Sequence, residues 1–405
     1  MLRELLTRFR QFSRQRRQRQ RAAQLSAVDA TALAGQAAPD PGRVLVLRND
    51  SIGDYLLYRP CLRQLSAVIR GRGQLLILAA NDLWSPLAQA WDADLFDELL
   101  VIAFGRFQQD LTYRAEVLRT IGAGGYGEVI YPLHVREPAV ENFIRFLRSP
   151  VRVASQGEHR ADAWFQALDA GYTRLLPTAR QTLFEYDRNR EFFQNWQVGL
   201  AVNDAKATVE PAPLHLPAAV LMAAGALKAT DPPYVILFPG ASARQKRWPA
   251  GHFAHVAQGL HRRFAGRYRL VLAGSPADVG QGHRIQQAAG QAVPLDNRCG
   301  QTDLPSLAAL VAGAALLISN DTVAAHLAAQ AGVPGITVLM GENYGKFFPY
   351  PSALLRAPSH CLFPPDMEAR FARGDFSRPG HNPNIAQISP ERVLAAAIEL
   401  LGAPA

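Results

Sequence analysis

The chain has 405 residues, 48% of them hydrophobic and 19% charged, so it is globular and long enough for two or three domains. No apolar run approaches the roughly 20 residues that span a bilayer, and no hydrophobic core follows the basic start as in a secretory signal. The three cysteines lie far apart in the sequence, which argues against a disulfide framework or a structural zinc site and favours a reducing compartment.

Basic charge is concentrated at the start of the chain. Residues 1–25 hold eight arginines and one glutamate and so carry +7 of the formal charge of +9, which leaves a nearly neutral body and disfavours nucleic-acid binding. Apolar residues recur here at three- and four-residue steps: Leu2, Leu5, Leu6, Phe9 and Phe12. This pattern predicts a helix for an anionic membrane interface. A disordered basic arm, a helix packed on the protein and a mitochondrial presequence are the alternatives.

Residues 26–42, rich in Ala, Gly and Pro, are predicted as a linker, and two series of alternating strands and helices follow. The first series predicts strands at 44–47, 75–79, 99–103 and 128–131, with helices at 54–70, 83–90, 111–121 and 138–147. The second predicts strands at 234–238, 268–273, 316–319 and 335–339, with helices at 253–264, 278–289, 304–313 and 322–331. Such alternation indicates parallel, doubly wound sheets.

We therefore expect an α/β protein with two Rossmann-like domains that face a cleft and a basic N-terminal helix or arm. The predicted parts are a tail with linker (1–42), an N-terminal domain (43–230), a C-terminal domain (231–388) and a final helix (389–405). The less regular stretch 178–230 joins the two series.

The first candidate site follows the strand at 44–47. Asp50, Ser51, Gly53 and Asp54 lie where a parallel strand ends and a helix begins, which is where open α/β sheets bind ligands. Free amides at the helix start favour an anion, whereas a carboxylate there could take a proton from a substrate hydroxyl. The alternative is that an aspartate here only caps the helix.

The second candidate site follows the strand at 234–238. Gly240 allows a ligand to approach the backbone, Ser242 could hydrogen-bond a phosphate, and Lys246 could neutralise a diphosphate. The spacing of a Walker loop is absent. A solvated basic loop is the alternative.

The third candidate site spans residues 315–350. Asp321 and Thr322 lie at a strand-to-helix turn, His326 lies on the helix, and Gly341 ends the next strand. An aspartate cap and a histidine on the packed side of the helix are the alternatives.

The fourth candidate site is the turn that precedes the predicted helix at 278–289. Asp278 begins this helix, and an acidic residue there could accept hydrogen bonds from a ribose.

These four segments, in this order, resemble the lipopolysaccharide heptosyltransferase family, glycosyltransferase family nine. The family's strand–turn–helix start is similar to Ser51–Asp54, its PGAS…KRWP segment to Pro239–Pro249, and its NDS…H segment to Asn320–Pro334. The resemblance covers about residues 43–402 and departs from the family at Val323 and in the segment 340–345, both of which touch the donor pocket.

The resemblance implies a GT-B fold, in which an acceptor-binding N-terminal domain and a nucleotide-sugar-binding C-terminal domain are followed by a helix that returns towards the first domain. It implies that Asp54 is the general base and that Asp278 contacts the ribose. It also implies that Ser242 and Lys246 contact the donor phosphates, and that Asp321 and Thr322 contact the diphosphate and sugar. Supporting residues are Asp50, Ser51, Gly53, Gly240, His326 and Gly341.

The expected function is inverting transfer of a heptose-like sugar from a nucleotide-diphosphate donor to a hydroxyl of a cell-envelope glycan or glycolipid. A lysine and helix amides can stabilise the leaving group, so no metal and no cofactor are expected. The expected location is the cytoplasm, peripheral to the inner face of the cytoplasmic membrane, with no nucleic-acid partner. A nucleotide-sugar epimerase and a non-catalytic sugar-nucleotide-binding module on the same fold are the alternatives.

Overall fold

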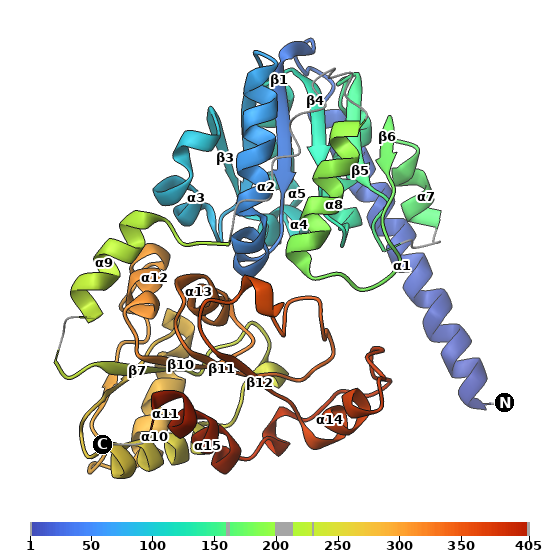
Figure 1. Ribbon diagram of the computed structural model, residues 1–405. Coiled ribbons are helices and arrows are strands. Elements are labelled where there is room, and N and C mark those ends of the chain that lie inside the picture. Colours follow the sequence, from blue (N-terminus) through green and yellow to red (C-terminus); the bar gives the residue numbers. More distant parts are fainter. Residues whose placement is uncertain (1, 159–162, 199–213, 229–230, 403–405) are drawn as a thin grey trace. The chain divides into compact units, whose positions relative to one another are not determined.

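The computed structural model describes residues 2–158, 163–198, 214–228 and 231–402, and of residues 2–15 it describes the backbone alone. The chain divides into two compact units (Figure 1). Unit 1 comprises residues 1–181 and 186–212, and unit 2 comprises residues 182–185 and 213–405.

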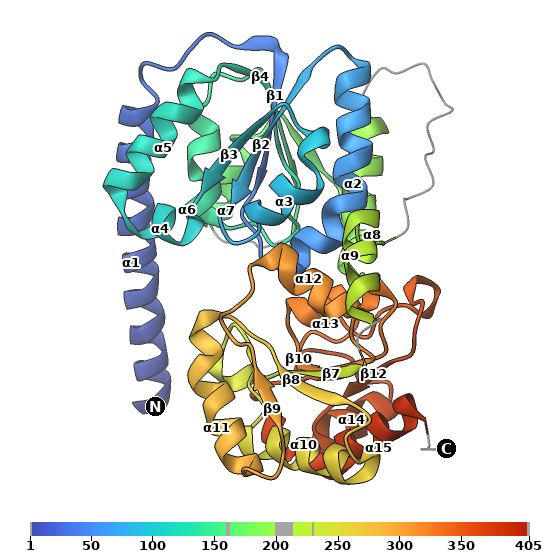
Figure 2. The same ribbon diagram turned by 90° about the vertical axis from the view of Figure 1, so that its left-hand side faces the viewer.

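Unit 1 is built on a parallel sheet with the strand order β3-β2-β1-β4-β5-β6. Its strands are β1 (Asp40–Arg48), β2 (Leu75–Asn81), β3 (Glu98–Ile102), β4 (Tyr126–Tyr131), β5 (Val151–Ser155) and β6 (Arg174–Leu176). Its helices are α1 (Leu2–Ala32), α2 (Ile52–Gly71), α3 (Ser85–Trp91), α4 (Phe104–Gln109), α5 (Leu111–Ala123), α6 (Pro138–Glu141), α7 (Ala163–Asp169) and α8 (Glu185–Val198), which starts one residue before unit 1 resumes. Helices α2 and α8 cover one face of the sheet, and α1, α4 and α5 the other (Figure 2).

Unit 2 repeats this plan with the strand order β12-β11-β10-β7-β8-β9, also parallel. Its strands are β7 (Tyr234–Phe238), β8 (Arg269–Leu272), β9 (Leu295–Asn297), β10 (Leu316–Asn320), β11 (Gly335–Val338) and β12 (Ser359–Leu362). Its helices are α9 (Ala218–Lys228), α10 (Ala250–Phe264), α11 (Val279–Ala289), α12 (Leu304–Ala312), α13 (Val323–Ala331), α14 (Pro365–Ala372) and α15 (Pro390–Leu401). Two parallel six-stranded sheets confirm the predicted α/β class.

All eight predicted strands are present, and four further strands lie at or next to sheet edges. These four are β5, β6, β9 and β12, of which β6 and β9 have only three residues each. Central strands such as β7 are buried at every position and therefore read as continuous apolar runs. The four missed strands have exposed or half-buried positions and polar residues, so they lack that signal.

The described contacts assign both α9 and α15 to unit 2. Helix α9 begins unit 2 because it packs on α12, so the chain leaves unit 1 at residue 212, before the predicted boundary at 230. The described contacts of α15 lie in unit 2, where Val393 and Ala397 are buried in the core beside α10. Gly259 allows this close approach, since a Cβ there would lie 2.3 Å from Leu394 Cδ2.

The predicted linker at residues 26–42 is wrong over its first half, because α1 continues to Ala32. This part of α1 packs on α5, and its side chains at Leu25 and Asp29 are fully buried. Alanine is a strong helix former, and neither glycine nor proline interrupts the chain before Gly35. From Arg16 onwards, the alternative of a helix packed on the protein is therefore confirmed for one face of α1.

A buried ion pair joins α1 to α5. Arg114 donates from Nε to Asp29 Oδ1 over 2.5 Å and from Nη2 to Asp29 Oδ2 over 2.8 Å. Asn142 Nδ2 donates to the same carboxylate over 2.7 Å. Both ion-pair side chains are 0% exposed, so loss of either partner leaves a charge buried without its counter-charge.

We predict that Asp29→Ala lowers the free energy of unfolding by about 3–5 kcal/mol, the usual cost of breaking a buried pair on one side. The measurement is urea unfolding, with Thr31→Ala on the exposed surface of the same helix as the control. The double variant Asp29→Leu/Arg114→Met should recover part of the loss, because no charge then stays buried. Equal unfolding midpoints for Asp29→Ala and the control would contradict this account.

Candidate functional site

The turn between β1 and α2 forms the part of the candidate site that lies in unit 1. Ser51 is the N-cap of α2 and Asp54 is the third residue of its first turn. Asp54 Oδ2 accepts a hydrogen bond from the Ser51 amide over 3.3 Å and another from Ser51 Oγ. The helix-cap interpretation therefore holds for Asp54. Its carboxylate is only half-buried, so it also remains accessible, and its catalytic role stays a prediction.

Arg48 holds the side chain of Asp50, two residues further along the chain, in place. The Arg48 side chain is fully buried, and its Nη2 pairs with Asp50 Oδ2. Its Nη1 donates to Asn189 Oδ1 over 3.2 Å, and its guanidinium lies 3.7 Å from the centroid of the Tyr58 ring. Arg48 was not predicted as a site residue, although a charged residue that ends an apolar strand is itself a signal of a buried polar contact.

Burial raises the pKa of Asp50 to about 6, although the charge of Arg48 opposes the shift. The geometry agrees with this direction, because Asp50 Oδ1 is buried and receives no hydrogen bond from any described residue. The negative charge of Asp54 contributes to the raised pKa as well. Asp50 and Asp54 are therefore electrostatically coupled at the same turn.

In unit 2, Asn320 links the end of β10 to the end of β7. Its Nδ2 donates to the carbonyl oxygens of Pro239 and Gly240 over 2.8 and 3.2 Å, and its Oδ1 accepts from the Trp248 amide over 3.1 Å. The side chain is fully buried. Asn320 thus fixes both ends of the loop that carries Lys246. The sequence analysis placed it in a motif without giving it a role.

The structure brings Lys246 and Asp321 together. Lys246 Nζ donates to Asp321 Oδ2 over 3.2 Å, and the two side chains are 23% and 26% exposed. The alternative of a freely solvated basic loop is therefore wrong for Lys246. Ser242 is exposed and lies outside the pocket lining given below, and its contact with a donor phosphate stays a prediction. Thr322 caps α13, where its Oγ accepts from the Ala324 amide over 3.3 Å.

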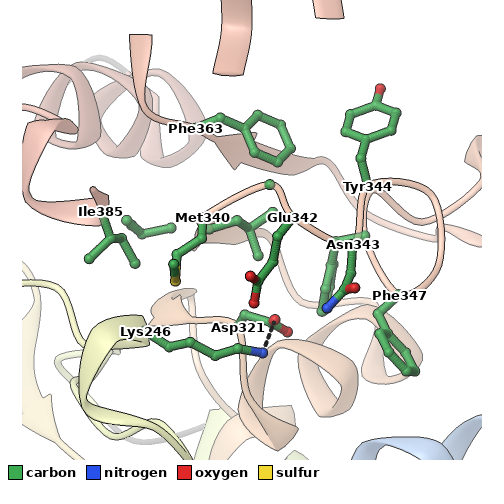
Figure 3. A pocket seen from close by; sticks show the side chains of 13 residues that line it. Lys246, Asp321, Met340, Glu342, Asn343, Tyr344, Phe347, Phe363 and Ile385 are labelled. Carbon is green, nitrogen blue, oxygen red and sulfur yellow. Dashed lines mark hydrogen bonds and ion pairs between the residues drawn. The ribbon is translucent and has the colours of Figure 1, made fainter. Parts of the chain in front are cut away.

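A pocket opens beside this pair (Figure 3). It combines charged groups, an aromatic wall and backbone of the segment that follows β11. Its lining consists of Lys246, Asp321, Val338, Leu339, Met340, Gly341, Glu342, Asn343, Tyr344, Phe347, Phe348, Phe363 and Ile385. Two predicted polar residues and the predicted Gly341 therefore share one concave surface, as expected of a small-molecule site.

Asp278 lies in the turn that follows β8 and is 4% exposed. Its Oδ2 accepts hydrogen bonds from the Ser275 amide over 2.9 Å and from Ser275 Oγ over 2.6 Å. A Cβ at Gly240 would lie 2.4 Å from this oxygen, so glycine is needed at that position. Asp278 therefore serves as a helix cap beside the end of β7, and a ribose contact stays a prediction.

His326 lies on the packed side of α13, as the alternative interpretation held. It is 4% exposed, and its Nδ1 lies 2.7 Å from the Tyr350 hydroxyl. Its ring also packs on Phe348, with centroids 4.7 Å apart. His326 supports the wall of the pocket and is absent from its lining.

No group of three or more side chains suited to a metal ion occurs among the described residues. The sequence contains one Asp-x-Asp pair, Asp92 and Asp94. The carboxylate of Asp92 is already bound by Arg59 Nε over 2.6 Å and by the Tyr55 hydroxyl over 2.7 Å. The Asp92 carboxylate therefore makes structural contacts within unit 1.

Comparison with known sequences identifies a family. The family described as glycosyltransferase family 9 (heptosyltransferase) matches residues 143–354, about half of the chain. Lipopolysaccharide heptosyltransferase 2 of Salmonella typhimurium is 29% identical over 178 residues, which cover 42% of this chain and 48% of that protein. Lipopolysaccharide heptosyltransferase 3 of Escherichia coli is 25% identical over 53% of this chain and 59% of its own length. The chain thus spans about half the length of the curated relatives it matches.

Solved structures share the fold over nearly the whole chain. A glycosyl transferase family 9 protein from Veillonella parvula matches 91% of this chain and 99% of its own, with a TM-score of 0.61 and 21% identity. The E. coli heptosyltransferase WaaC with ADP-2-deoxy-2-fluoro heptose matches 88% of this chain and 99% of its own, with a TM-score of 0.61 and 19% identity. The similarity to both structures is a similarity of fold.

We predict that the contribution of Asp50 to the free energy of unfolding falls as the pH rises from about 4 to about 6. Its pKa in the folded state exceeds the ordinary value of 3.8, so the folded state binds the proton more tightly. The stability that this proton supplies is complete below pH 4 and is lost as the pH rises through 6. A shift of this size corresponds to about 3 kcal/mol at most.

The measurement is urea unfolding of the wild type and of Asp50→Asn at several pH values from 4 to 7. The difference in free energy of unfolding, wild type minus variant, should decrease across this range. The exposed Asp94→Asn, whose side chain is 69% exposed in the wild type, serves as the control and should follow the wild type. Parallel pH curves for wild type and Asp50→Asn would refute the raised pKa.

Proposed function

Because the chain belongs to glycosyltransferase family 9, the heptosyltransferase family, we propose that it is an inverting glycosyltransferase. It transfers a heptose-like sugar from a nucleotide-diphosphate donor to a hydroxyl of a cell-envelope glycolipid. The observation that carries the proposal is the Lys246–Asp321 pair, which lies in a pocket at the ends of β7 and β10 within the region that matches the family. The names of the relatives, lipopolysaccharide heptosyltransferases, support the substrate class.

In unit 2, Lys246 supplies a cation for the departing diphosphate. Its ammonium is held by Asp321 at 3.2 Å, and the Asn320 bonds fix the loop that carries it. Charge that develops on the leaving oxygen is stabilised most by groups placed in advance, because they need no reorganisation during the reaction. A lysine in this role replaces the counter-charge that a divalent ion would give, so we propose that transfer needs no metal.

In unit 1, Asp54 acts as the general base. It removes the proton from the acceptor hydroxyl while that oxygen attacks the anomeric carbon and the bond to the diphosphate breaks. Attack from the face opposite the diphosphate inverts the anomeric configuration. The bonds from Ser51 hold the carboxylate at the start of α2, and its half-exposed position leaves it open to an acceptor.

The proposal places the reaction in the cytoplasm, beside the membrane that carries the acceptor. Cys61, Cys299 and Cys361 are all free, and a reducing compartment keeps thiols in this form. No helix among the described residues is long and apolar enough to cross a bilayer.

We expect Asp54→Asn to lower kcat by about 10²–10⁴-fold, the usual contribution of a general base. The assay follows transfer from ADP-heptose to lipopolysaccharide that lacks heptose, with and without EDTA. Asp82→Asn is the control, since Asp82 is an exposed aspartate directly after β2 in the same sheet.

Four outcomes would contradict parts of the proposal. Equal rates for Asp54→Asn and the control would remove Asp54 from the chemistry. Loss of transfer in EDTA, restored by a divalent ion, would overturn the metal-free mechanism. Release of an altered sugar without any acceptor would favour an epimerase, and donor binding without any turnover would favour a non-catalytic module.

We also propose that the first half of α1 binds an anionic membrane surface. Both ribbon views show α1 running on beyond the strands and helices of unit 1 (Figures 1 and 2). The sequence gives this half one apolar stripe between arginines, and Arg16, Arg17 and Arg19 just after it are exposed. Each basic side chain near an anionic surface contributes about 1 kcal/mol. From Arg16 onwards, the first buried side chain of α1 is Leu25, so the described packed part of the helix lies in its second half.

We predict that Leu6→Asp/Phe9→Asp reduces sedimentation with vesicles containing phosphatidylglycerol, most clearly at low salt. The matched control is Thr7→Asp/Gln11→Asp, which adds the same charge on the opposite side of the helical pattern. Turnover on a soluble acceptor analogue should stay unchanged in both, because neither change reaches the packed part of α1. Equal vesicle binding by the two double variants would show that the apolar stripe of α1 does not bind the membrane.

A further inference from the structure

The pocket of unit 2 contains more negative than positive charge. Its lining has one cation, Lys246, and two carboxylates, Asp321 and Glu342. Lys246 is already paired with Asp321, and the carboxylate of Glu342 points towards this pair (Figure 3). A diphosphate placed next to Glu342 would therefore meet a second negative charge that no described pocket residue balances. The diphosphate of the donor must therefore lie away from Glu342, and Glu342 must face another part of the donor.

Glu342 is well suited to bind hydroxyl groups. A carboxylate only accepts hydrogen bonds, and it offers two oxygens to donors such as the hydroxyls of a sugar. Charge-assisted bonds of this kind are about twice as strong as bonds between neutral groups. Asp321 presents a second carboxylate on the same side of the pocket (Figure 3). The two residues together can accept bonds from neighbouring hydroxyls of one sugar ring.

The segment that carries Glu342 is held in position by its neighbours. Gly341 has φ +85°, and a Cβ there would lie 3.1 Å from ring atoms of Phe363 and Phe371. Tyr344 packs on the same cluster, 4.3 Å from the centroid of Phe371 and 5.6 Å from that of Phe363. This packing fixes the backbone on both sides of Glu342 and gives the pocket an aromatic wall beside its carboxylates. An apolar wall with a few placed polar groups is typical of small-molecule sites.

We propose that Glu342 determines the specificity for the donor sugar. Its carboxylate accepts hydrogen bonds from hydroxyls of an uncharged sugar and repels a sugar that carries a carboxylate of its own. The substrate class is thus a nucleotide diphosphate linked to a neutral polyhydroxy sugar, with uronic acids excluded. This inference rests on the proposed transferase function, and it gives a role to a residue of the third segment to which the sequence motifs assigned none.

The test compares two probes that differ only by oxidation of C6, ADP-glucose and ADP-glucuronate, by isothermal titration of the full chain. The wild type should bind the neutral sugar at least about tenfold more tightly, since like charges placed together cost several kcal/mol. In Glu342→Gln, ADP-glucose should bind about fivefold more weakly and ADP-glucuronate more tightly, because the amide keeps one acceptor but loses the charge. Asp296→Asn, a carboxylate of unit 2 outside the pocket lining, should behave as the wild type.

Opposite changes in affinity for the two probes distinguish sugar selection from a general loss of pocket structure, because a destabilised pocket would bind both probes more weakly. Plain ADP serves as a third probe, and Glu342→Gln should bind it at least as tightly as the wild type does. If the wild type binds ADP-glucose and transfers sugar, but Glu342→Gln keeps the same preference between the two sugar probes, this inference is wrong and the proposed function stands. A wild type that binds none of the probes and transfers nothing would overturn both.

Discussion

In each unit, the position of the candidate residues depends on the place where the strand order of the parallel sheet reverses. In unit 1 the chain builds β1, β2 and β3 in one direction and then returns to add β4 on the other side of β1. Unit 2 repeats this with β10 added beside β7. Connections leave the two neighbouring strands in opposite directions at such a point, so a crevice remains at their carboxyl ends. Asp54 follows β1, Lys246 follows β7 and Asp321 follows β10, so the candidate residues of both units lie at these positions.

Buried polar side chains hold the turns beside each reversal. In unit 1, Arg48 is buried at the end of β1 and bonds to Asp50 and Asn189. In unit 2, Asn320 spans from β10 to the backbone after β7. A buried polar group costs free energy unless its hydrogen bonds are made, so each of these side chains permits only the loop conformation that satisfies it. The loops that carry Asp54 and Lys246 are therefore positioned by residues with no proposed part in the chemistry.

This arrangement explains which features the sequence could predict. Central strands are buried on both faces and read as apolar runs, and Asp54 and Lys246 follow such runs directly. Asn320 contacts Trp248, 72 residues away, and no local pattern reports that pairing. Glu342 lies in a segment without regular structure, where its direction depends on the packing of Gly341 against distant aromatic rings. The sequence predicts a linker over residues 26–32, where the structure has helix, because alanine-rich composition suits both, and only the burial of Leu25, Asp29 and Leu33 decides between them.

The extension of α1 into residues 26–32 also changes how a membrane-bound N-terminus would act on the rest of the chain. A flexible linker would let unit 1 rotate freely about its anchor. A continuous helix that is joined to α5 by the Asp29–Arg114 pair has no such freedom, because rotation would separate two buried charges. Membrane contact by the first half of α1 would then set the orientation of unit 1, and with it the direction in which the β1–α2 turn faces an acceptor. If the first half of α1 binds a membrane as proposed, the helix orients unit 1, and the Asp29–Arg114 ion pair is the contact that makes this possible.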